Sequence, residues 1–167
     1  CPKPDLIKID IQGAELMVLE NGPDTVSNAL VIETEVEFVP LYENQPLFGD
    51  MQRHLRDQGF ELHKLLDVAG RCYRPVNLGS PYTALSQMLW ADAVFVRSPF
   101  DLDRYAAEDL IKAAAILNDV YRSYDLVLRL LQEFDRRTGG DLARDYAAFL
   151  GGDVVPSPLH MTLREDG

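Results

Sequence analysis

Residues 5–22, with the sequence DLIKIDIQGAELMVLENG, combine a strand, a sharp turn and a short helix. Apolar and charged side chains alternate over residues 5–11, which is the period of a strand. Gly13 allows a tight turn that a Cβ atom would obstruct, and leucines at helical spacing follow it. Gly22, followed by proline, marks the end of the helix. A strand that runs directly into a helix is half of a βαβ unit, so the stretch predicts a parallel α/β sheet.

The periodicity of the remaining sequence predicts an α/β part followed by a helical part. Strands are expected over residues 30–38, 60–66 and 91–97, with a helix over 47–58 and loops over 23–28 and 67–84. Three helices are expected over residues 106–120, 125–137 and 141–150, the last capped by Asp141. The predicted domains are an α/β domain over residues 1–98, a helical segment over 99–152 and a tail over 153–167.

Acidic residues gather where α/β sheets bind ligands. Asp10 ends the first strand, and ligands of open α/β sheets bind beyond the carboxyl ends of strands. Glu33, Glu35 and Glu37 share one face of the second strand, about 6.6 Å apart at 3.3 Å per residue. Carboxylates buried together would repel one another and take up protons. We therefore expect Glu33 to lie deepest and Glu37 to lie in water.

Asp10 and Glu33 are the candidate catalytic residues. Asp10 would orient an acceptor or help to take its proton, or else it caps the helix or pairs with Lys8. Glu33, on the neighbouring strand, could act as a general base through a raised pKa, or chelate magnesium together with Asp10, or be a solvated strand end. Lys8 is expected to be buried in a structural ion pair. Glu15 is expected to favour the first turn of its helix through the helix dipole.

Composition narrows the class of protein. The 167 residues carry a formal net charge of -11, which disfavours nucleic acid and anionic membranes as partners. No apolar run reaches the roughly 20 residues that span a bilayer. Cys1 and Cys72 form no disulfide framework, so a cytoplasmic location is expected. The histidines, which are His54, His63 and His160, have no metal-ligand spacing, and no metal site is predicted.

These residues resemble FkbM-family methyltransferases. The first block that carries the resemblance consists of Lys8, Ile9, Asp10, Ile11, Gln12, Gly13, Ala14, Glu15, Leu16 and Leu19. The second is VIETEVEFVPLYENQPLFGDM over residues 31–51, followed by the GF of residues 59–60. A closing strand, WADAVFVR over residues 90–97, is also similar. The resemblance covers about the first hundred residues.

The resemblance implies the C-terminal half of a Rossmann-like class I methyltransferase sheet, mostly parallel with its last strand antiparallel. It implies methyl transfer from S-adenosylmethionine to a hydroxyl of a small-molecule or saccharide acceptor, with Asp10 beside donor and acceptor. That fold holds its donor on a glycine-rich loop after the first strand, and this sequence has no such loop. The chain is therefore expected to be a fragment, inactive alone, that self-associates through the strand at residues 5–11 or through its C-terminal helices.

Two other functions fit the same sequence. The sheet could be a scaffold without enzymatic activity whose last helices bind a partner or dimerise. Alternatively, the chain could stand beside a glycosyltransferase in a larger polypeptide and methylate saccharides. Two structural expectations do not depend on which of these functions is correct. The strand over residues 91–97 should run antiparallel to its neighbours, and the helices over 106–120 and 125–137 should pack as a hairpin.

Overall fold

The computed structural model of the protein describes residues 3–80, 83–84 and 86–151. The chain divides into two compact units, with the boundary between Ser98 and Pro99. The predicted tail over residues 153–167 lies outside the described residues. Within the described part, no helix is both long enough and apolar enough to cross a lipid bilayer.

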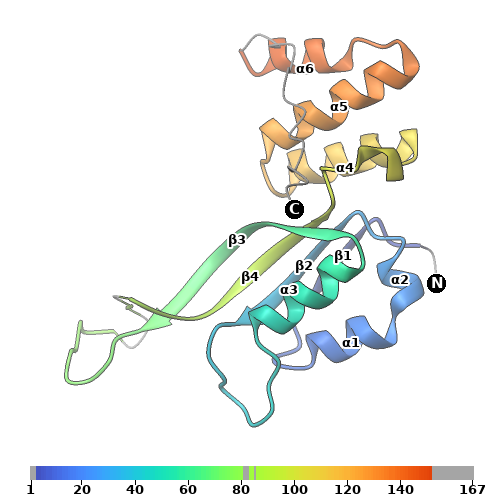
Figure 1. The fold of residues 1–167 in the computed structure, drawn as a ribbon. Coiled ribbons are helices and arrows are strands. Elements are labelled where there is room, and N and C mark those ends of the chain that lie inside the picture. Colours follow the sequence, from blue (N-terminus) through green and yellow to red (C-terminus); the bar gives the residue numbers. More distant parts are fainter. Residues whose placement is uncertain (1–2, 81–82, 85, 152–167) are drawn as a thin grey trace, which may run out of the picture. The chain divides into compact units, whose positions relative to one another are not determined.

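The first unit is built on a four-stranded sheet (Figure 1). Its strands are β1 (Leu6–Ile9), β2 (Val31–Glu37), β3 (Phe60–Arg71) and β4 (Gln87–Arg97), in the order β1-β2-β4-β3. β1 and β2 pair in parallel, whereas β4 is antiparallel to both of its neighbours. Three strands therefore run in one direction and the last runs in the other, which confirms the mixed α/β class and the predicted β3–β4 hairpin.

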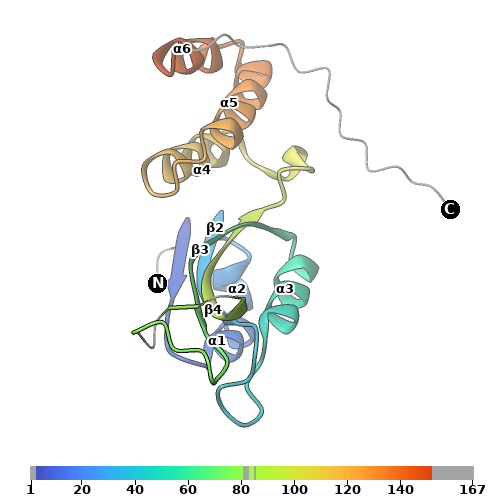
Figure 2. The same cartoon turned by 90° about the vertical axis from the view of Figure 1, so that its left-hand side faces the viewer.

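Three helices cover one face of this sheet, as Figures 1 and 2 show. They are α1 (Glu15–Asn21), α2 (Pro23–Val26) and α3 (Phe48–Asp57), of which α2 falls where the sequence predicted a loop. The core between helices and sheet consists of Leu19, Val26, Ala29, Ile32, Val36, Met51, Leu55, Phe60, Ala93 and Phe95. The isoleucines of β1 pack against this core, so the alternation in the first stretch places its charged residues on the opposite face.

The β3–β4 hairpin is longer than predicted and extends beyond the other two strands (Figure 1). The predicted loop over residues 67–84 is wrong at its start, because β3 continues to Arg71. Register shifts in the β3–β4 pairing, one of them between Leu66 and Ala69, interrupt the alternation that marks a strand. Gly70 lets the chains approach closely, since a Cβ atom there would lie 2.3 Å from the carbonyl oxygen of Gln87.

The second unit is helical. Its elements are a short 3-10 helix η1 (Leu102–Arg104) and the helices α4 (Ala107–Asp119), α5 (Tyr124–Thr138) and α6 (Leu142–Phe149). α4 and α5 pack against each other, which confirms the predicted helical hairpin, and α6 packs on α5. The buried side chains of Leu110 and Leu117 on α4 and Leu130 on α5 form the apolar faces that the sequence predicted.

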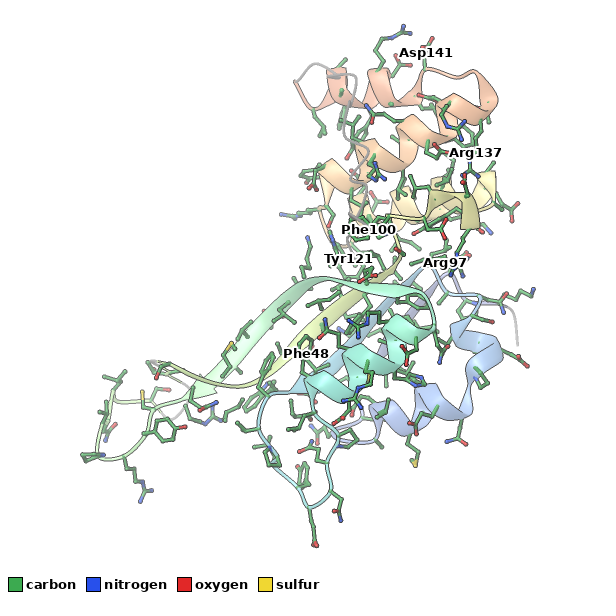
Figure 3. All side chains as sticks on the ribbon, in the orientation of Figure 1. Phe48, Arg97, Phe100, Tyr121, Arg137 and Asp141 are labelled. Atoms are coloured by element: carbon green, nitrogen blue, oxygen red, sulfur yellow. The ribbon has the colours of Figure 1, made fainter. Side chains whose placement is uncertain are left out.

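Polar side chains on α5 hold the helical unit together. The carboxylate of Asp135 accepts hydrogen bonds from the backbone N–H groups of Leu142 and Ala143, at 3.1 and 2.8 Å. Asp141 is the N-cap residue of α6, as predicted, but its side chain makes no capping hydrogen bond. Arg137, labelled in Figure 3, lies on α5. Its guanidinium group donates to the carbonyl oxygens of Leu102 and Tyr105, both at 2.7 Å. These bonds fasten the segment before α4 to α5.

Candidate acceptor site at the carboxyl edge of the sheet

The shared direction of β1, β2 and β3 brings the loops that follow them to one edge of the sheet. Asp10 comes directly after β1, and Glu37 is the last residue of β2. Glu15 begins α1, on the other side of the turn that follows β1. The edge is therefore rich in carboxylates, and Asp10 lies there, as its position at the end of the first strand predicted.

Glu15 fixes the turn between β1 and α1. Its carboxylate accepts hydrogen bonds from the backbone N–H groups of Ile11 and Gly13, both at 2.8 Å, and the residue is only 3% exposed. Gln12 and Gly13 have φ angles of 58° and 111°, a left-handed conformation that glycine adopts without strain. Glu15 therefore has a structural role that goes beyond the helix dipole, because it holds the turn that positions Asp10.

Asp10, Glu15 and Glu35 form a carboxylate cluster. One carboxylate oxygen from each lies within 4.8 Å of the other two, and Asp10 is the exposed member. Burial raises the pKa of Glu35, and the negative charges of Asp10, Glu15 and Asp92 raise it further. The oxygens could coordinate a divalent cation. The sequence had considered Glu33 as the partner of Asp10 in such a site, whereas the structure brings Asp10 together with Glu15 and Glu35.

Glu33 is engaged by Lys8. The two residues lie opposite each other in the parallel pair of β1 and β2, and the ammonium group of Lys8 hydrogen-bonds to the Glu33 carboxylate. Lys8 Nζ also lies 3.9 Å from Asp92 Oδ2. The hydrogen bond to Glu33 raises the pKa of Lys8. The predicted ion pair is present, but the side chain of Lys8 is 59% exposed, so its expected burial is wrong.

Glu37 is a buried acid that the sequence placed in water. It is only 5% exposed, and this burial, together with the charges of Glu15 and Glu35, raises its pKa to about 7. A small cavity beside it is lined by Pro46 and Leu47, from the irregular segment that follows β2. That segment has no sequence period, so nothing in the sequence indicated that it folds over the end of the strand.

An α/β unit with acidic side chains at the carboxyl edge of its sheet has the architecture of many enzymes. Residues 2–62 match the family model of the methyltransferase FkbM domain. The match contains β1, α1, β2 and α3, and with them Asp10 and Glu33. It confirms the resemblance to FkbM-family methyltransferases over residues 2–62. No curated protein and no solved structure gave a significant match.

Proposed function

We propose that the chain carries the acceptor side of an FkbM-type methyltransferase that uses S-adenosylmethionine to methylate a hydroxyl group of a small-molecule or saccharide acceptor. The observation that supports this most is the family match over the unit of β1, turn and α1, which positions Asp10. Bound elsewhere in the enzyme, S-adenosylmethionine would supply an electrophilic methyl group on a positively charged sulfur.

Asp10 is our first candidate for the chemistry. Its carboxylate is exposed at the carboxyl edge, so an acceptor can reach it, and Glu15 holds the turn beside it. In the reaction the acceptor hydroxyl would lose its proton, which Asp10 would receive or steer, as its oxygen forms a bond to the methyl carbon. The carbon–sulfur bond of the donor would break, and the neutral thioether would leave. Positioning the two reactants can supply roughly 7–11 kcal/mol of the barrier reduction. Glu33 remains the second candidate, with Lys8 balancing its charge.

The described loops do not fit the donor. The segments after β1 and β2 contain one glycine, Gly13, and the segment after β3 contains Gly79, so none is a glycine-rich loop that could approach a nucleoside. Among the described residues, β1 pairs only with β2 and lies at the edge of the sheet. We propose that a donor-binding part, encoded outside these 167 residues, continues the sheet at β1. Pairing with a second copy of the chain is the alternative for this edge.

Replacing Asp10 tests the proposed function in the enzyme with its donor-binding part present. The assay follows labelled methyl groups from S-adenosylmethionine to a panel of saccharides and small hydroxyl compounds. We expect Asp10→Asn to lower kcat by roughly 100- to 10,000-fold, the usual contribution of a positioned proton acceptor. Asp24→Asn, on the exposed surface of α2, is the matched control and should keep the wild-type rate. A wild-type kcat in Asp10→Asn would remove Asp10 from the mechanism, and an inactive donor-loaded wild type would contradict the proposed function.

A further inference from the structure

The tip of the β3–β4 hairpin contains a hollow of about 720 Å³ that is open to solvent. Arg71, at the end of β3, lines it together with polar side chains of the connecting loop, namely Cys72, Arg74, Asn77, Ser80 and Thr83. The volume is within the range of small-molecule sites, roughly 300–1,000 Å³. A hollow of this size could therefore accommodate part of an acceptor.

The charge of this region differs from the charge of the chain. The protein has 27 acidic residues and a net charge of -11, yet residues 68–91 contain no aspartate or glutamate and include two arginines, Arg71 and Arg74. No described residue that lines the hollow carries a carboxylate. The tip is thus a local positive site in an acidic protein, and it should attract anions that the rest of the surface repels.

The two arginines are arranged differently. The guanidinium group of Arg71 stacks 5.1 Å from the centre of the Trp90 ring and donates a hydrogen bond to the carbonyl oxygen of Gly70 at 2.8 Å. Its position is therefore fixed by β3 and β4. Arg74 is exposed, and no described residue forms an ion pair or hydrogen bond with its side chain. A fixed arginine next to an available one suits an anionic oxygen group, which guanidinium groups bind through paired N–H donors.

The strand register relates the hollow to the carboxylate cluster. Leu66 of β3 is level with Asp92 of β4, and Asp92 is level with Glu35, a member of the cluster. Arg71 follows Leu66 by five residues, which is roughly 16 Å along a strand at about 3.3 Å per residue. β3 also lies two strands from β2, roughly 10 Å across the sheet, so Arg71 and the cluster are roughly 20 Å apart. Both sites lie on the carboxyl side of the sheet. One extended molecule could therefore occupy them together.

We propose that the hollow binds an anionic group of the methyl acceptor, a carboxylate, phosphate or sulfate, roughly 20 Å from the hydroxyl that is methylated at Asp10. The acceptor is accordingly an extended, acidic molecule. Binding energy from such a remote anion would hold the reacting hydroxyl in place, which is how remote contacts raise the rate of a reaction. This inference rests on the proposed function for its biological meaning, but anion binding can be measured without methyl transfer.

Trp90 provides the measurement, because it is the only tryptophan in the chain and lies against Arg71. Its fluorescence is followed while the chain is titrated with inorganic phosphate, sulfate or glucuronate at constant ionic strength. We expect a saturable change with at least one of these anions and none with glucose. The anion that binds most tightly shows whether the hollow prefers a phosphate, a sulfate or a carboxylate group. The absence of saturation with all three would overturn the proposal.

Two variants separate a site from general charge attraction. Arg74→Gln should weaken binding by roughly 10- to 100-fold, the value of one or two charge-assisted hydrogen bonds. Arg56→Gln removes the same charge from the exposed surface of α3 and should bind as the wild type does. Melting curves of both variants should match the wild type. Equal anion affinities of Arg74→Gln and Arg56→Gln would contradict a specific anion site at the hairpin tip. The Asp10 experiment would still test methyl transfer independently.

Discussion

Leu130→Asp is expected to unfold the helical unit of residues 99–151. Leu130 is 1% exposed on α5, the helix that packs against α4 and carries α6. The substitution removes a buried leucine side chain, which costs about 2–5 kcal/mol, and places an unpaired charge in the same position. The sum approaches the whole stability of a small unit, about 5–15 kcal/mol. Circular dichroism at 222 nm should show a large loss of helical signal or a melting temperature lower by tens of degrees.

The matched control is Phe149→Asp. Phe149 ends α6 and is 84% exposed, so the same charge there should leave the melting curve nearly unchanged. Wild-type melting of Leu130→Asp would show that the packed face of α5 is exposed in solution, and it would contradict the helical hairpin.

The stability of the α/β unit should fall as the pH rises from about 4.5 to about 7, because of Glu37. Its pKa is raised from 4.5 to about 7, chiefly by burial. The folded state therefore binds more protons than the unfolded state between these two values, and deprotonation in that window destabilises the fold. The shift corresponds to about 3 kcal/mol, at roughly 1.4 kcal/mol per pKa unit. Above pH 7 the loss is complete.

Glu37→Gln should remove most of this dependence. The amide has the size of the acid without the charge. At pH 8 the variant should therefore melt several degrees higher than the wild type, whereas at pH 4.5 the two should melt at the same temperature. Glu35 and Asp92 also have raised pKa values, so a shallow slope of the same sign should remain. Glu133 makes stability depend on pH only below about pH 4.5, since Arg136 and Arg137 lower its pKa to about 2.

The control for Glu37 is Glu43→Gln. Glu43 is exposed in the segment between β2 and α3, so its replacement should leave the pH dependence of the wild type. Equal melting temperatures for Glu37→Gln and wild type at pH 8 would mean that the Glu37 carboxylate reaches water in solution.

The sequence predicted those features that depend on residues close together in the chain. Alternation over residues 5–11 placed Asp10 at the end of a strand, and the lack of a crossover helix before residues 91–97 predicted an antiparallel last strand. Features that depend on distant segments were missed. The buried Glu37 lines a small cavity together with Pro46 and Leu47 of the aperiodic segment after β2. The hydrogen bonds to the first N–H groups of α6 come from Asp135 of the preceding helix. Lys8 was expected to be buried, but its side chain is mostly exposed to solvent.

The β3–β4 hairpin shows a second reason why prediction from the sequence fell short. A glycine in a predicted strand usually weakens the assignment. At Gly70 the glycine instead permits the close approach of β3 and β4, and a register shift nearby hides the alternation. The two arginines at the tip were therefore assigned to a loop, and their possible relation to the acceptor emerged only from the strand register.

Isothermal titration of the 167-residue chain with S-adenosylmethionine tests the central claim, that these residues hold the acceptor side of a methyltransferase and the donor site lies elsewhere. Light scattering on the same sample establishes whether the chain is a monomer or has paired through β1. We expect no saturable heat of binding, because none of the described loops is rich in glycine. Saturable binding at micromolar concentrations by the monomer would contradict the claim and would place the donor site within this chain.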